Sequence, residues 1–127
     1  MTAGTWLLVA LLGGTGSIAR FLVDGLVGER AGDGWLGAGS FPWGTFVVNI
    51  SGAALLGGVS GAALTGNALI LAGTATLGSY TTLSTWMLES HRLGQDDQLL
   101  IAAVNLLGSL VAGFAAVVLG HAVGAAL

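Results

Sequence analysis

The sequence contains no cysteine, no lysine and a single proline among its 127 residues. Without cysteine the chain can form neither a disulfide framework nor a thiolate metal site. Charged side chains make up only 7% of the residues, against roughly 25% in a typical soluble domain. No Asp, Glu, Lys or Arg occurs in the 55 residues from Gly34 to Leu88. Such an absence excludes an ordinary water-soluble domain and is expected in lipid, where burying a lone charge is costly.

Two function classes are also poorly supported by what is missing. The net charge of −3 is small and dispersed, which argues against a nucleic-acid partner. No nucleophile stands with a plausible base, so we expect no enzymatic activity. What the chain has instead is 54% apolar residues and a mean hydropathy of +0.91. These values predict an all-α, multi-pass protein of the lipid bilayer.

A chain of this length forms one domain, residues 1–127, and four crossings of about 20 residues would use most of it. The expected spans are approximately residues 4–27, 42–64, 68–88 and 99–120. Pro42 opens the second span, where its missing N–H does no harm. The charged segments Gly28 to Ser40 and Glu89 to Gln98 are expected loops. An even number of spans puts both termini on one side of the membrane.

Glycine accounts for 23 residues, and its spacing predicts close helix contacts. Small residues recur four apart at Gly57 and Gly61, at Ser109 and Gly113, and at Gly120 and Gly124. Such pairs let the backbones of membrane helices approach each other closely. A four-helix chain this short has little interior of its own, so lining a pathway requires a second copy or a partner. We therefore expect a dimer.

Polar residues inside the expected spans suggest the wall of a pathway for something small and hydrophilic. Hydroxyls gather in the third span, at Thr74, Thr76, Ser79, Thr81, Thr82, Ser84 and Thr85. Thr45 and Asn49 share a helix face in the second span, as Asn105 and Ser109 do in the fourth. Neutral donors without an embedded carboxylate favour an anion over a cation. The missing acid also argues against a proton-coupled antiporter.

The centre of the third span is open to two interpretations. Gly78, Ser79, Thr81 and Thr82 are poor helix formers, and unwound carbonyls at this depth can coordinate Na⁺. Alternatively, the helix is continuous and its hydroxyls bond back to its own carbonyls. The residues alone do not decide between the two.

Four segments resemble the Fluc (CrcB) family of fluoride channels. They are residues 13–20 (GGTGSIAR), 44–52 (GTFVVNISG), 78–86 (GSYTTLSTW) and the glycine-rich fourth span. The resemblance covers essentially the whole chain, in order and with matching spacing. The patterns G-T-x-x-V-N-x-x-G and G-x-x-T-T-x-S-T are specific when they occur together.

The resemblance implies a passive, fluoride-selective channel that exports fluoride from the cytoplasm across the cell (plasma) membrane. Such channels are antiparallel, dual-topology dimers of four-helix subunits with two pores. Their third helix is broken at the midplane, and backbone carbonyls of both subunits hold a structural Na⁺ at the dimer interface. By position, these carbonyls belong to Gly78 and Thr81.

The resemblance also implies roles for individual side chains. The pore asparagine of the family falls on Asn49, its first-span arginine on Arg20, and its acid near the vestibule on Glu89. Its hydroxyl track falls on Ser84 and Thr85. Asn105 stands where the family often has tyrosine, and Ser109 where it often has serine.

The chain departs from the family at two aromatic positions. The family places two phenylalanines three residues apart beside the ion, and this chain has Leu83 and Trp86 there. Leucine offers no donor, so the chain forms either a homodimer with one aromatic station or half of a heterodimer with a paralogous subunit. All three arginines lie opposite the termini, at Arg20, Arg30 and Arg92. A dual-topology homodimer should show almost no such bias, and positive-inside placement would put both termini outside the cytoplasm.

Two other classes remain as alternatives. A small multidrug-type antiporter has a similar length and four spans, but it needs an acid in the first span. A non-conducting assembly subunit would share the packing glycines without needing the hydroxyl run. Fluoride flux without pH coupling separates the channel from the antiporter, and flux from the purified single chain separates it from the assembly subunit.

Overall fold

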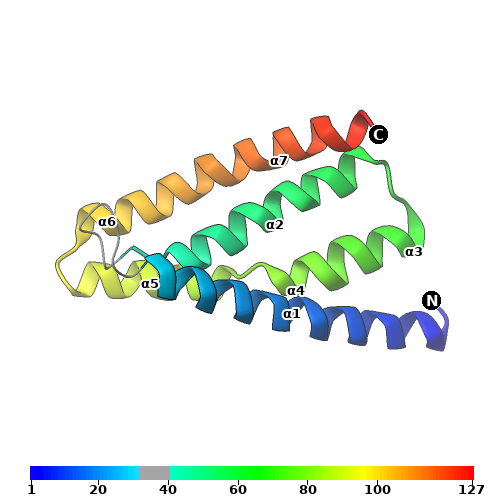
Figure 1. The fold of residues 1–127 in the computed structure, drawn as a ribbon, viewed down its shortest axis with the longest axis horizontal. Coiled ribbons are helices and arrows are strands. Elements are labelled where there is room, and N and C mark those ends of the chain that lie inside the picture. The colour runs from blue at the N-terminus through cyan, green and yellow to red at the C-terminus, as the bar shows by residue number, and fades with distance from the viewer. Residues whose placement is uncertain (32–40) are drawn as a thin grey trace.

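The structure, a computed structural model, describes residues 1–31 and 41–127, and these form a bundle of helices (Figure 1). Most of the expected first loop, Asp33 included, lies outside the described residues. Helix α1 (Ala3–Ala31) is followed by α2 (Trp43–Gly61). The last helix runs from Leu99 to Ala125. These helices are long and apolar enough to cross a membrane, and the prediction of an all-α membrane protein is confirmed.

The last helix contains a π-helical stretch in its first half. It consists of α6 (Leu99–Ala103), the π-helical η2 (Val104–Gly108) and α7 (Ser109–Ala125). The N- and C-termini lie at the same end of the bundle (Figure 1).

The segment between α2 and α6 is helical in two pieces. The first comprises α3 (Gly66–Leu69), the π-helical η1 (Ile70–Leu77) and α4 (Gly78–Tyr80). The second is α5 (Leu83–Gln95). Between them Thr81 and Thr82 have extended backbone, with ψ of 160° and 122°.

Two helices continue past the expected ends of their spans. Helix α1 includes Glu29 and Arg30, and α5 includes Glu89 and Arg92. Charge ends a membrane span because lipid cannot solvate it, but Glu and Arg are good helix formers in water. A helix therefore continues where the span stops.

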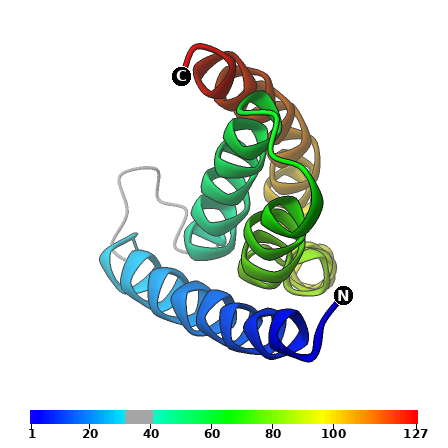
Figure 2. The same cartoon turned by 90° about the vertical axis from the view of Figure 1, so that its right-hand side faces the viewer.

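Helices α2 and α7 run parallel and side by side (Figures 1 and 2). At each of the four glycines of this contact, an added Cβ would collide with a backbone carbonyl oxygen of the other helix. Gly57 and Gly61 face Val117 and His121, and Gly120 and Gly124 face Ala54 and Gly58. The predicted packing role of these glycines is confirmed. At Gly113 a Cβ would make only ordinary contact, 3.8 Å from the nearest atom.

Helix α1 packs against η1 and α4 (Figure 2). Among the glycines of α1, Gly16 makes the tightest approach to these elements. A Cβ at Gly16 would overlap the Thr76 carbonyl and the Ser79 hydroxyl. Much of the remaining surface is apolar and open, for example at Phe21 (76% exposed) and Phe114 (73%). A soluble monomer rarely exposes so much apolar surface, whereas a membrane protein presents it to lipid or to another subunit.

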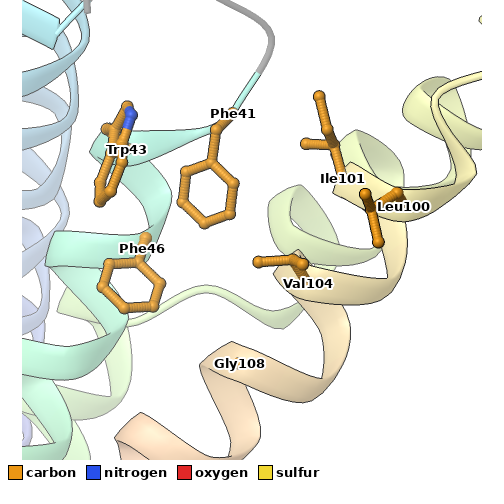
Figure 3. Close-up of a pocket in the computed structure, with 7 residues that line it drawn as sticks. All are labelled: Phe41, Trp43, Phe46, Leu100, Ile101, Val104 and Gly108. Carbon is orange, nitrogen blue, oxygen red and sulfur yellow. The ribbon is translucent and has the colours of Figure 1, made fainter. Parts of the chain in front are cut away.

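An aromatic cluster lies where α2 begins. The ring centroids of Phe41 and Trp43 are 4.6 Å apart, and those of Trp43 and Phe46 are 6.0 Å apart. Figure 3 shows these rings on one side of a pocket of about 340 Å³, with Leu100 and Val104 on the other side. The side chains that line this pocket are apolar, which separates it from the polar cavities described below.

Candidate functional site

The break between α4 and α5 is held by a side chain from another helix. Asn49 of α2 donates from Nδ2 to the Thr82 carbonyl oxygen at 2.8 Å, and its Oδ1 accepts from the Thr82 amide at 2.8 Å. One amide side chain thus satisfies both backbone groups of Thr82, which an uninterrupted helix would have satisfied itself. Thr82 in turn caps α5, since its hydroxyl accepts from the Thr85 amide at 3.3 Å.

The break leaves backbone groups of both polarities free. Among the described residues, no amide donates to the carbonyls of Gly78 or Thr81 at the end of α4. On the other side, the amides of Leu83 and Ser84 in the first turn of α5 have no acceptor in the described part of the chain. A helix C-terminus favours a cation and a helix N-terminus favours an anion.

A polar cavity of about 310 Å³, here called the inner chamber, adjoins the first turn of α5. It is lined by residues of α1, α2 and α5 and by the break: Arg20, Phe21, Asp24, Thr45, Val48, Thr82, Ser84 and Thr85. Arg20 supplies a guanidinium, whose N–H groups donate hydrogen bonds and which has no acceptor. With the free amide of Ser84 and the hydroxyls of Ser84 and Thr85, it gives the inner chamber several hydrogen-bond donors suited to an anion. The carboxyl group of Asp24 also lines this chamber, so its wall is not made of donors alone.

A second polar cavity of about 460 Å³, the outer chamber, lies toward the charged end of α5. Its polar lining residues are Asp24, Glu89, Arg92, Asp96 and Gln98. Asp24 lines both chambers. Thr45 of the inner chamber also donates to Glu89 Oε1 of the outer one at 2.9 Å. The two chambers therefore form adjoining parts of one polar region along α1, α2 and α5.

Glu89 lies between the chambers, one residue beyond the expected third span. Its Oε2 is buried and has no hydrogen-bond partner among the described residues. Burial raises the pKa of this carboxyl. The hydrogen bond from Thr45 lowers the pKa, nearby Asp24 raises it, and Arg92 lowers it.

Trp86, Asn105 and Ser109 lie apart from the chambers, in a network between α5 and the last helix in which Asn105 is buried and Trp86 and Ser109 are half-buried. Trp86 Nε1 donates to the Asn105 carbonyl oxygen at 3.1 Å, and Asn105 Nδ2 donates to Ser90 Oγ at 2.9 Å. Ser90 Oγ donates to the Trp86 carbonyl at 2.8 Å, which closes a ring of bonds. The Ser109 hydroxyl is 3.4 Å from Asn105 Oδ1, a long donor–acceptor distance. The indole N–H of Trp86 is therefore already occupied within the subunit.

The structure divides the predicted site residues into groups. Arg20, Ser84 and Thr85 meet in the inner chamber. Asn49, Gly78 and Thr81 lie at or beside the break. The side chain of Leu83 is 68% exposed on the surface of the subunit.

Sequence reasoning did not include Asp24 or Ser90 in the site. Their helical spacing carried a signal, because Asp24 is four residues from Arg20 and Ser90 is four residues from Trp86. Each thus shares a helix face with a residue that was predicted. Thr82 was recognised as a poor helix former, but its capping of α5 was not.

The helices, the apolar surface and the polar chambers define a multi-pass membrane protein with a polar cavity that adjoins a helix break. The sequence profile of the family described as CrcB-like protein, Camphor Resistance (CrcB), matches residues 7–121. A protein of Mycolicibacterium paratuberculosis named fluoride-specific ion channel FluC 2 is 53% identical over 120 residues, which cover 94% of this chain and 93% of that protein. The chain belongs to the CrcB family.

More distant relatives carry the same description. A FluC 2 of Mycobacterium tuberculosis (strain H37Rv) is 51% identical over 121 residues, 95% of this chain and 91% of its own length. A protein of Frankia casuarinae named fluoride-specific ion channel FluC 1 is 38% identical over 131 residues, which cover 96% of this chain and 97% of that protein. Each of these alignments spans nearly the full length of this chain and of the relative.

Proposed function

We propose that this protein is a passive, fluoride-selective channel of the plasma membrane that exports fluoride from the cytoplasm. The observation that carries the proposal is the inner chamber, which is lined by Arg20 of α1 and by Ser84 and Thr85 in the first turn of α5. The family relationship supports it, because the relatives are named fluoride-specific ion channels. No energy source is required: a membrane potential that is negative inside drives the anion outward.

The chemistry of the chamber suits a small, strongly hydrated anion. Fluoride enters a pore only if its water shell is replaced by dense hydrogen-bond donors. Hydroxyls, free amides and a guanidinium are such donors, and none of them needs to lose a proton to act. In our proposal the ion passes from the outer chamber, beside Glu89 and Arg92, to the hydroxyls of Ser84 and Thr85.

A structural Na⁺ fits the cation-favouring side of the break. The carbonyls of Gly78 and Thr81 lack amide donors in the described residues, and they stand at the end of a helix. Neutral oxygens are suitable ligands for a hard cation such as Na⁺. In our proposal these carbonyls, with the same pair from a second subunit, would hold Na⁺ at the membrane midplane. The ion would supply positive charge that lowers the cost of an anion nearby.

The functional unit in our proposal is an antiparallel dimer with two pores. The wide apolar surface of α1 and the exposed Leu83 support a second subunit, because a single chain encloses little. The partner is either a second copy or a paralogous subunit. The heterodimer is favoured by Leu83, which cannot donate to an anion, and by Trp86, whose indole N–H is already bonded to Asn105. Trp86 could then offer only its ring edge.

The test is fluoride release from liposomes that contain this chain alone, followed with a fluoride electrode and with chloride release as the control. We expect fast release of fluoride but not of chloride when valinomycin balances the charge with K⁺. Release that proceeds equally without valinomycin would indicate electroneutral exchange and contradict a channel. Conduction only after addition of a paralogous subunit would identify the heterodimer.

A further inference from the structure

Helix α5 is a half-helix whose position depends on side chains. The break at Thr81 and Thr82 removes the backbone hydrogen bonds that would fix α5 to α4. Among the described residues, the buried polar side chains other than Thr5 lie on α5, at its cap or bonded to it: Thr45, Thr82, Ser90 and Asn105. Buried polar groups are therefore concentrated where helix continuity is lost.

These side chains hold α5 from two directions. On the α2 side, Asn49 bonds to Thr82 and Thr45 bonds to Glu89. On the other side, two hydrogen bonds join α5 to the helix Leu99–Ala125 in the described part of the protein. The Asn105 side chain donates to Ser90, and the Trp86 indole N–H donates to the main-chain carbonyl of Asn105. Without the second set, no side-chain hydrogen bond in the described residues would fix the rotation of α5 against the helix Leu99–Ala125.

Asn105 makes hydrogen bonds to α5 and lies apart from the chambers through which an ion would pass. Asn105 is 0% exposed, and its side-chain Nδ2 donates to Ser90 Oγ at 2.9 Å. The Trp86 indole N–H donates instead to the main-chain carbonyl of Asn105, at 3.1 Å. Ser84 and Trp86 are two residues apart, so their side chains point in directions roughly 160° apart around α5. The face of α5 that Asn105 holds is thus opposite the face that carries Ser84 into the inner chamber.

We propose that Asn105 is a positioning residue for ion conduction. Its side chain acts through the Ser90 hydroxyl, which also donates to the Trp86 carbonyl. It thereby fixes the rotation of α5 and keeps Ser84 and Thr85 facing Arg20 across the inner chamber. This inference rests on the proposed function, since it assigns a role in fluoride passage to a residue that does not touch the ion. It differs from the position-based expectation that Asn105 itself lines the fluoride path.

The experiment compares Asn105→Ala, Ser90→Ala and the double variant in the liposome assay, over a range of fluoride concentrations. Each single variant breaks the same hydrogen bond, so each should lower the maximal release rate at least tenfold. The fluoride concentration at half-maximal rate should not change, because no ligand of the ion has been removed. The double variant should be no slower than the slower single variant, since the bond can be lost only once.

Controls separate positioning from general damage. Asn67→Ala removes an exposed asparagine near the turn between α2 and α3 and should leave release unchanged. Ser90→Thr keeps the hydroxyl and should restore release relative to Ser90→Ala. If Asn105→Ala does not fold, Ser90→Ala with its threonine rescue tests the proposal alone. Two results would overturn the proposal. One is a double variant whose release rate falls by the product of the two single reductions, and the other is a shift in the fluoride concentration at half-maximal rate.

A second readout does not depend on conduction. In a protein labelled with ¹⁵N-tryptophan, the indole N–H of Trp86 should exchange with solvent more slowly than that of exposed Trp6. Ser90→Ala should accelerate the exchange of the Trp86 indole N–H and leave that of Trp6 unchanged. Equal Trp86 exchange in the wild type and the variant would refute the proposal that Ser90 helps to hold α5 in place. If the wild-type chain releases no fluoride either alone or with a paralogous subunit, the proposed function fails. The exchange at Trp86 still reports on the hydrogen bonds between Trp86, Ser90 and Asn105.

Discussion

Replacing Asn49 by leucine removes the side chain that holds the break before α5. The variant loses two hydrogen bonds of 2.8 Å, one to each backbone group of Thr82. Each buried backbone group left without a partner costs about 1–3 kcal/mol. Asn49→Leu should therefore destabilise the local structure at the break by about 2–6 kcal/mol.

The direct assay is amide hydrogen exchange at Thr82 in lipid nanodiscs. Because about 1.4 kcal/mol corresponds to a factor of ten in an equilibrium constant, loss of the acceptor should speed exchange of the Thr82 amide by about tenfold or more. Asn49→Asp keeps an acceptor for this amide and has no N–H for the carbonyl. Its Thr82 exchange should stay close to that of the wild type.

The control variant lies on the same helix. Ser60 is exposed near the end of α2, and Ser60→Ala should leave the exchange at Thr82 unchanged. If Asn49→Leu exchanged at the wild-type rate, the break would be stable without Asn49, and our explanation of it would be refuted. Fluoride release by Asn49→Leu should fall in parallel, because Thr82 leads into the turn that carries Ser84 and Thr85.

Three further predictions concern packing, charge and the cation. Gly57→Ala would push a Cβ into the Val117 carbonyl and should lower the free energy of unfolding by about 1–3 kcal/mol, which a lower melting temperature would show. As a control, Gly14→Ala adds a Cβ with no neighbouring atom within 4 Å and should not lower the melting temperature. The raised pKa of Glu89 means that the folded state binds its proton more tightly, so wild-type stability should fall as pH rises from the ordinary value of 4.5 through the raised pKa. Glu89→Gln should lack this decline in pH-dependent unfolding; an identical profile would contradict the assignment. Exchanging Na⁺ for N-methylglucamine during purification should reduce the dimer fraction in size-exclusion chromatography, and a constant fraction would argue against a structural Na⁺.

Features set by local composition could be predicted from the sequence. The spacing of Gly57, Gly61, Gly120 and Gly124 predicted close helix contacts, and the structure places all four against backbone carbonyls. Small residues at a spacing of four share one helix face whatever the rest of the fold does. Which helix these glycines contact could be learned only from the structure.

Features set by contacts between distant residues could not be predicted. The residues alone left open whether the third span continues or is interrupted, because the hydroxyl residues there fit both interpretations. Only the family resemblance implied a broken helix. In the structure Thr82 is extended and bonded to Asn49, which lies 33 residues earlier in the chain. The separation of Trp86 and Asn105 from the chambers likewise depends on how α5 packs against η2. No local pattern contains that information.

The central claim is that fluoride passes through this protein passively and selectively. It is tested most directly by the reversal potential in a planar bilayer that contains the purified chain, under a tenfold gradient of fluoride with chloride held equal. The account predicts a current that reverses near the fluoride equilibrium potential, about 59 mV for one charge, at pH values on both sides of neutrality. A reversal near zero, or one that follows the pH gradient, would contradict a fluoride-selective passive channel.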